Sequence, residues 1–117
     1  MSNQTMLIVD DSRLTRMMVR NFVTSVQPDW QIIEAVDGED ALKKVEDAEI
    51  DWMTIDFNMP GMDGMELAEK LKSKFPDAHI SLLTAHVQDA TRKKAEALGI
   101  EFIGKPITEY KIISYVA

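Results

Sequence analysis

Five short apolar runs, separated by longer segments, limit most strongly what this chain can fold into. The runs are TMLIV, QIIEA, WMTID, AHISLLT and EFI, at residues 5–9, 31–35, 52–56, 78–84 and 101–103. Such short apolar runs, bounded by polar or turn-forming residues, are typical of buried strands. Nearly continuous apolar strands indicate a parallel sheet that is covered on both faces. We therefore expect an α/β fold, a doubly wound (βα)5 sandwich with right-handed crossovers.

The segments between these runs have the residue spacing of amphipathic helices. The expected helices cover about residues 13–26, 37–48, 65–75, 88–98 and 108–116. Apolar residues at intervals of three and four predict the buried face of the first helix. This face consists of Leu14, Met17, Met18, Phe22 and Val26. The fourth helix is only weakly amphipathic, and its main apolar residues are Ala90, Ala97 and Leu98.

The composition limits the classes of function that this chain can have. Its 117 residues suit one domain, residues 1–117, in which we find no repeat and no linker. The net charge of −7 argues against direct binding to nucleic acid or to an anionic membrane. The absence of cysteine excludes disulfides and thiolate metal sites. Because the first apolar run is too short for a signal peptide or a membrane span, we expect a cytoplasmic protein.

Polar side chains that can take part in catalysis or metal binding stand at or just after the ends of four of the five expected strands. In a parallel sheet the carboxyl ends of all strands lie on one edge, where such folds bind ligands. The residues expected there are Asp10 and Asp11 after the first strand, Asp56 at the end of the third, Thr84 at the end of the fourth and Lys105 after the fifth. The sequence therefore predicts three carboxylates, a hydroxyl and an ammonium group close together.

Three carboxylates in one place repel each other, because like charges about 4 Å apart cost several kcal/mol at a lowered dielectric constant. One lysine cannot neutralise all three. A hard divalent cation with oxygen ligands would neutralise them. Mg²⁺, or Mn²⁺ in its place, is such a cation, and it also leaves a coordination position for a phosphate oxygen. Asp56 precedes an exposed turn, NMPG, which makes it the candidate nucleophile of a phosphoryl transfer. The alternative is that Asp56 only starts this turn, since Asp is common in turns.

The motifs at these strand ends resemble those of the receiver domain of two-component response regulators, the CheY-like family. They are the acidic pair in IVDDS, the acceptor in IDFNMPGMDG, the hydroxyl in LLTAH and the lysine in IGKPI. Their order and spacing match the family over the whole length of the chain. The resemblance implies the flavodoxin-like strand order 2-1-3-4-5.

The resemblance also implies a role for each residue at this edge of the sheet. Asp56 accepts a phosphoryl group from a sensor histidine kinase or a histidine phosphotransfer protein. Asp11 and Asp56 bind Mg²⁺ directly, Asp10 binds it mainly through water, and the backbone carbonyl of Asn58 is a further ligand. The protein catalyses its own phosphorylation and dephosphorylation and has no separate substrate, so it is not an enzyme in the usual sense.

Further residues are implied to read out the phosphorylated state. Lys105 pairs with the phosphate, Thr84 moves to bond it, and Phe102 swings inward behind Thr84. Pro106 is expected to follow a cis peptide bond, and Asn58 and His86 are expected to tune the lifetime of the phosphoryl group. The surface of the fourth helix, fifth strand and fifth helix then signals to an output partner or effector domain that the sequence does not identify. In such chemotaxis-like signalling we expect a monomer or a weak, phosphorylation-dependent dimer.

Several of these residues also have a purely structural interpretation. Phe102 replaces the tyrosine of some relatives, and the alternative to a switch role is a plain core aromatic. His86 is equally a solvated loop histidine. An arginine stripe on the first helix, Arg13, Arg16 and Arg20, is either a solvated face or the site where the histidine-containing partner docks.

Two other functional classes remain on the same fold. A flavodoxin-like cofactor binder needs a loop rich in Gly, Ser or Thr after the first strand to hold a phosphate on backbone amides. This chain has Asp10 and Asp11 there, which repel a phosphate in the absence of a metal. A receiver-shaped interaction module that is never phosphorylated usually lacks an acid or the lysine, and here all are present.

Overall fold

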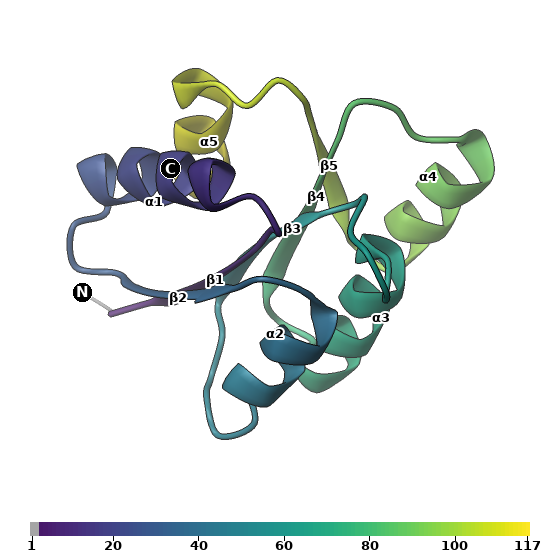
Figure 1. The fold of residues 1–117 in the computed structure, drawn as a ribbon, viewed down its shortest axis with the longest axis horizontal. Helices are drawn as coiled ribbons and strands as arrows, with labels where there is room; N and C mark the ends of the chain where they lie inside the picture. Colours follow the sequence, from purple (N-terminus) through teal and green to yellow (C-terminus); the bar gives the residue numbers. More distant parts are fainter. Residues whose placement is uncertain (1–2) are drawn as a thin grey trace.

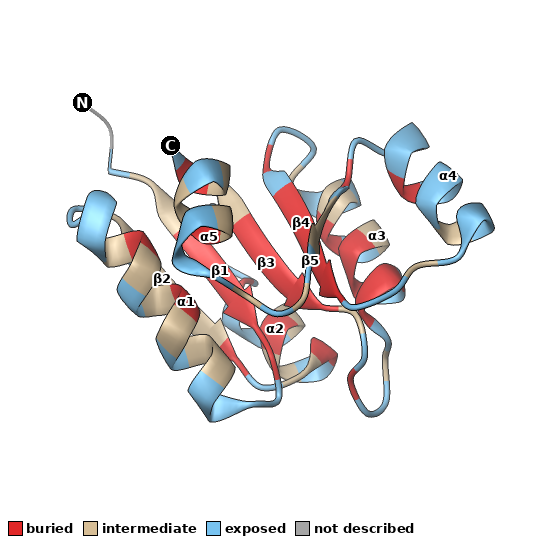
Figure 2. Cartoon of the chain, turned by 90° about the horizontal axis from the view of Figure 1, so that it is seen from above, coloured by how far each residue is buried: buried red, intermediate tan, exposed pale blue. Residues whose placement is uncertain are grey.

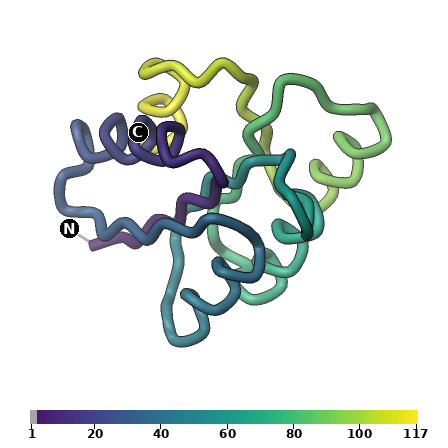
Figure 3. Tube along the Cα trace, viewed as in Figure 1, coloured from purple at the N-terminus to yellow at the C-terminus, as the bar shows by residue number. Residues whose placement is uncertain are grey.

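A five-stranded parallel sheet, in the order β2-β1-β3-β4-β5, forms the centre of the molecule. The structure is a computed structural model that describes residues 3–117. The strands are β1 (Thr5–Val9), β2 (Gln31–Ala35), β3 (Trp52–Asp56), β4 (His79–Thr84) and β5 (Glu101–Gly104). The backbone trace passes from each strand through a helix to the next strand (Figure 3). The predicted fold class and strand order are confirmed.

Helices cover both faces of the sheet (Figure 1). One face carries α1 (Arg13–Val26) and α5 (Glu109–Val116), and the other carries α2 (Gly38–Lys44), α3 (Gly64–Lys74) and α4 (Asp89–Ala97). Side chains cap the first turns of four helices by accepting a hydrogen bond from a backbone N–H three residues ahead. The capping residues are Ser12, Asp37, Asp63 and Thr108. None of the helices in the described part of the chain is long and apolar enough to cross a membrane.

The strands contribute to two separate cores, because successive side chains point to opposite faces of the sheet. Met6 and Ile8 of β1 are buried on the side of α1 and α5, and Leu7 and Val9 are buried on the side of α2 and α3. The three central strands β1, β3 and β4 are buried almost throughout, as their red colour in Figure 2 shows, whereas the edge strands β2 and β5 are mostly of intermediate exposure. This double burial explains why the strands are nearly continuous apolar runs and do not alternate with polar residues.

The buried face of α1 differs from the predicted one. Val19 and Val23 are fully buried, whereas Leu14, Met17 and Val26 are exposed, Leu14 to 66%. The apolar residues of this helix fit two overlapping stripes with the same spacing, and the pattern alone does not choose between them. In the fold the small β-branched residues take the centre, where α1 packs on the sheet next to α5, and Phe22 is partly buried beside them.

The weakly amphipathic helix α4 has only a small buried face. Ala90, Ala97 and Leu98 are all exposed, and the helix is fixed to the core by Ala95 and by Ile100, which follows it. Because α4 presents one small buried residue to the sheet, it contributes less apolar contact than α3, which has five buried residues. The position of α4 therefore depends more on its two flanking loops than that of α3 does.

Candidate functional site

Three carboxylates meet at the carboxyl edge of the sheet, as predicted. Asp10 and Asp11 directly follow β1, and Asp56 is the last residue of β3, the neighbouring strand. One oxygen of each carboxylate lies within 4.8 Å of the oxygens of the other two. Asp10 and Asp56 are buried, at 2% and 3% exposure, and Asp11 is exposed. The cluster is therefore open to solvent on the side of Asp11.

The ammonium group of Lys105 faces this cluster. Its Nζ lies 2.8 Å from Oδ1 of Asp56, and its side chain remains one third exposed. The lysine follows β5, so the contact joins two strands that are separated by β4. The peptide bond between Lys105 and Pro106 is cis, as expected from the resemblance. One ammonium group against three carboxylates leaves the cluster with an excess of negative charge.

The environment of Asp10 fits a cation. Its Oδ1 accepts a hydrogen bond of 2.8 Å from the backbone N–H of Ser12, but its Oδ2 is buried and has no hydrogen-bond partner among residues 3–117. Burial, and next to it the negative charge of Asp56, raise the pKa of Asp10 to about 6 although the Ser12 bond opposes the shift. A buried carboxylate oxygen without a donor is costly unless a cation or a proton satisfies it. The oxygen-only ligand set is that of Mg²⁺ or Mn²⁺.

The raised pKa predicts that Asp10 weakens the metal-free fold at neutral pH. A group with a higher pKa in the folded state stabilises the fold when protonated, and this contribution is lost as the pH rises through about 6. We expect Asp10→Asn, measured by urea unfolding in EDTA at pH 7.5, to raise the free energy of unfolding by about 1–3 kcal/mol. The gain should be smaller at pH 5, because the folded wild-type protein is then largely protonated at Asp10.

Asp29→Asn is the matched control, because Asp29 is an exposed carboxylate outside the cluster. It should leave the stability nearly unchanged at both pH values. A lower stability of Asp10→Asn in EDTA at pH 7.5 would contradict the assignment of an unsatisfied charge to this carboxylate.

Thr84, the last residue of β4, is turned toward its own loop. Its hydroxyl donates a hydrogen bond of 2.7 Å to the backbone carbonyl of His86 and accepts one of 3.2 Å from the N–H of the same residue. A hydroxyl group has a single proton to donate. Thr84 can therefore bond an oxygen at the cluster only by giving up the carbonyl of His86, which frees the loop between β4 and α4.

Phe102 in β5 is partly buried and lies beside α4. The guanidinium of Arg92 is 5.4 Å from the centre of its ring, within the range of a cation–π contact. Both residues line a groove of about 300 Å³, together with Thr84 and His86. The ring of Phe102 and the hydroxyl of Thr84 therefore border the same space, into which a side chain can turn. The prediction of a movable aromatic at this position is compatible with the space available.

Asn58 and His86 both line a second groove of about 470 Å³. Both side chains are exposed, and they come from the loops after β3 and β4. The structure thus brings together two loops that are far apart in the sequence. The roles of Asn58, through its side chain or its backbone carbonyl, and of His86 remain predictions.

The sequence interpretation missed the role of two arginines on α1. The predicted stripe of Arg13, Arg16 and Arg20 is divided, because Arg16 and Arg20 both turn toward the carboxylate of Glu34 on β2, at 3.0 and 2.6 Å. A glutamate in the middle of the apolar strand QIIEA was the available signal. A charge in such a strand needs a partner, and arginines four residues apart on a helix lie on one face.

Comparison with known proteins identifies the class of protein to which this fold and this carboxylate cluster belong. The family model described as the response regulator receiver domain matches residues 6–117. The chain belongs to the response regulator receiver domain family, and it has the CheY-like fold.

Individual relatives show how the match extends. The chain is 33% identical over 114 residues to the chemotaxis protein CheY of Listeria monocytogenes, covering 92% of this chain and 91% of that protein. It is 36% identical over 105 residues to the cyclic di-GMP phosphodiesterase response regulator RpfG of Xanthomonas campestris, covering 86% of this chain but only 28% of that protein. In the crystal structure of the CheX-CheY-BeF3-Mg²⁺ complex from Borrelia burgdorferi, the matching chain has 31% identity and a TM-score of 0.84, with 97% of this chain and 86% of that chain covered.

Proposed function

We propose that this chain is a phosphorylation-driven signalling switch, and that Asp56 accepts the phosphoryl group. The observation that carries the proposal is the position of Asp56, which is buried at the end of β3 with Lys105 at 2.8 Å and two further carboxylates beside it. In this arrangement Asp56 is a carboxylate nucleophile with a cation ready for the incoming charge. We include residues 1–117 in one receiver domain.

The proposed reaction is an in-line phosphoryl transfer. A carboxylate oxygen of Asp56 attacks the phosphorus atom of a phosphohistidine or a small acyl phosphate. The new O–P bond forms an acyl phosphate as the bond to the donor's nitrogen or oxygen breaks, and the leaving group takes that electron pair. Lys105 donates hydrogen bonds to the oxygens of the transferred phosphoryl group, over which negative charge is spread in the transition state. The group is later lost to water, so the chain needs no separate substrate.

The carboxylates of Asp10, Asp11 and Asp56, with the backbone carbonyl of Asn58, would hold the divalent cation. We propose Mg²⁺, or Mn²⁺ in its place; the Borrelia relative is seen in a complex with Mg²⁺. When bound, this ion neutralises charge on the cluster and on the phosphoryl oxygens. The unsatisfied Oδ2 of Asp10 supports a cation at this position.

The readout would begin at Thr84. A phosphoryl oxygen on Asp56 offers the hydroxyl a charged acceptor, which is a stronger partner than the carbonyl of His86. Movement of Thr84 would open space for Phe102, which lines the same groove. The altered surface is that of α4, β5 and α5, where α4 has few core contacts to resist a shift.

The donor is proposed to be a sensor histidine kinase or a histidine phosphotransfer protein. Exposed apolar residues on the first turns of α1, Leu14 and Met17, lie next to the acidic cluster in the sequence and support docking there. Because the chain spans only 28% of the phosphodiesterase regulator that it matches but 91% of CheY, output through a partner protein and output through an effector domain are both consistent with the relatives.

Acetyl phosphate tests this function directly. We expect incubation with acetyl phosphate and Mg²⁺ to add the mass of one phosphoryl group to the intact protein, and EDTA or Asp56→Asn to abolish the gain. Asp77→Asn, which removes an exposed carboxylate between α3 and β4, should be phosphorylated like the wild type. No mass gain in the wild type would instead support an interaction module that is never phosphorylated.

A further inference from the structure

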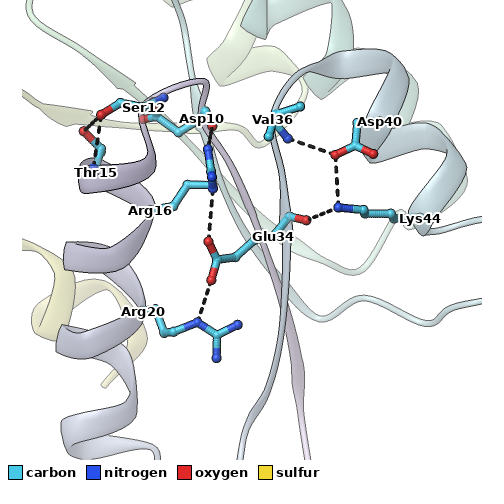
Figure 4. Close-up of polar contacts among 9 residues, drawn as sticks. All are labelled: Asp10, Ser12, Thr15, Arg16, Arg20, Glu34, Val36, Asp40 and Lys44. Atoms are coloured by element: carbon cyan, nitrogen blue, oxygen red, sulfur yellow. Dashed lines mark hydrogen bonds and ion pairs between the residues drawn. The ribbon is translucent and has the colours of Figure 1, made fainter.

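A single guanidinium group connects the acidic cluster to the edge of the sheet. Nη1 of Arg16 donates a hydrogen bond of 2.6 Å to the backbone carbonyl of Asp10, and its Nε donates one of 3.0 Å to Oε1 of Glu34 (Figure 4). The side chain of Arg16 is only 12% exposed, although α1 is a surface helix. Arg16 thus joins three elements: α1, the end of β1, and β2.

Glu34 is fixed from several sides, so it is a rigid anchor for Arg16. Its Oε2 accepts a hydrogen bond of 2.6 Å from Nε of Arg20, and its backbone carbonyl accepts one of 2.8 Å from Nζ of Lys44. Burial alone would raise the pKa of Glu34, but the hydrogen bonds and charges of Arg20 and Arg16 outweigh it and lower this pKa. The carboxylate therefore stays ionised and holds Arg16 in one orientation.

The carbonyl that Arg16 holds belongs to the peptide unit between Asp10 and Asp11. On the other side of Asp10 the backbone is also held, because its N–H donates a hydrogen bond of 3.1 Å to the carbonyl of Ala35 on β2. Since a peptide unit is planar, fixing its carbonyl fixes the direction in which the chain continues to Asp11. That direction decides whether the carboxylate of Asp11 reaches the cluster, because Asp11 itself is exposed and its carboxylate has no hydrogen bond in the described part of the chain.

We propose that Arg16 is a positioning residue for the cation site: its bond to the Asp10 carbonyl, anchored on Glu34, sets the peptide that brings both aspartates to Asp56. This inference rests on the proposed function in that the site takes a divalent cation. Arg20 also binds Glu34, but it does not contact Asp10, and its side chain is 42% exposed. It is therefore not expected to position the aspartates. The two arginines therefore form a matched pair for an experiment.

The test compares the Mg²⁺ affinities of Arg16→Gln and Arg20→Gln, titrated by the NMR shifts of the Asp11 and Ser12 amides. Both substitutions remove one positive charge near an anionic site, and this alone should tighten binding of a cation in both variants. If Arg16 positions the aspartates, Arg16→Gln should instead weaken Mg²⁺ binding. We expect Arg16→Gln to bind Mg²⁺ at least fivefold more weakly than the wild type, and Arg20→Gln to bind within twofold of it or more tightly.

A third variant keeps the test informative if Arg16→Gln does not fold. Arg16→Lys retains the charge, but an ammonium group lacks the planar fork that spans a carbonyl and a carboxylate together. It should bind Mg²⁺ more than twofold more weakly than the wild type. A merely structural role predicts lower stability with unchanged affinity, and affinities of both Arg16 variants equal to or tighter than the wild type would overturn the inference.

The outcomes separate this inference from the function on which it rests. If the wild type binds Mg²⁺ and is phosphorylated while the Arg16 variants bind Mg²⁺ equally well, only the role of Arg16 fails. If the wild type itself shows no Mg²⁺-dependent shifts of the Asp11 and Ser12 amides, the cation site fails, and the role of Arg16 fails with it.

Discussion

Gly64→Ala should cost about 2–4 kcal/mol of unfolding free energy and should also slow phosphorylation. Gly64 is the buried first residue of α3, and a Cβ atom added to it would lie 2.5 Å from the backbone oxygen of Asp56 and 2.7 Å from Cα of Phe57. Both neighbours are backbone atoms, which cannot rotate away as a side chain can. The end of β3 must therefore shift, and it carries the proposed nucleophile with it. Urea unfolding and the rate of mass gain with acetyl phosphate measure the two effects.

Gly104→Ala is the control for this substitution. Gly104 lies in β5 at the same edge of the sheet, but the nearest atom to an added Cβ is Nζ of Lys111 at 3.9 Å, and the backbone needs no positive φ there. Alanine should leave the stability unchanged or raise it by about 0.5 kcal/mol, because glycine in a strand costs conformational entropy. A loss at Gly104 as large as that at Gly64 would show that the close approach to Asp56 is not the cause.

Lys105→Met should slow phosphorylation by acetyl phosphate about 10²–10³-fold, the usual cost of removing one preorganised donor from a transition state. The same substitution should lower the stability in EDTA by about 1–3 kcal/mol, because Asp56 is buried and would lose its partner while Lys105 is partly exposed. Mg²⁺ binding should become about three- to tenfold tighter, since a positive charge leaves the site. Slower phosphorylation together with tighter metal binding separates a role in the transition state from a loss of the site.

Lys94→Met makes the same change of charge elsewhere. Lys94 forms an exposed ion pair of 3.2 Å with Glu69, between α4 and α3. Exposed pairs contribute little, so its stability, Mg²⁺ affinity and phosphorylation rate should all stay close to those of the wild type. A phosphorylation rate of Lys105→Met within threefold of the wild type would contradict the role proposed for the lysine.

Much of the site was predictable from the chain alone, for a simple geometric reason. Once the strands are parallel, the residues that follow them must lie along one edge, whatever the details of packing. Asp10, Asp11, Asp56 and Lys105 needed no more than this, and the structure brings them together. The strands themselves could be identified because burial on both faces leaves a nearly continuous apolar run.

Other features could not be predicted because the local sequence is compatible with two alternatives, and only the tertiary packing selects one of them. The spacing in α1 allows two apolar stripes, and only packing against the sheet and α5 selects Val19 and Val23 over Leu14 and Met17. The orientation of Thr84 toward His86 depends on the path of a loop, for which side-chain pattern carries no signal.

The sequence by itself therefore determined the order of the elements and the chemical groups at the sheet edge, because both follow from the period of the apolar residues and the polarity of the strands. Only the tertiary structure decided which face of α1 is buried and that Arg16 spans Glu34 and the Asp10 carbonyl. The physical reason is that long side chains bind groups that are far apart in the sequence. Which groups lie within their reach depends on how the helices pack on the sheet and not on the spacing of residues in the sequence.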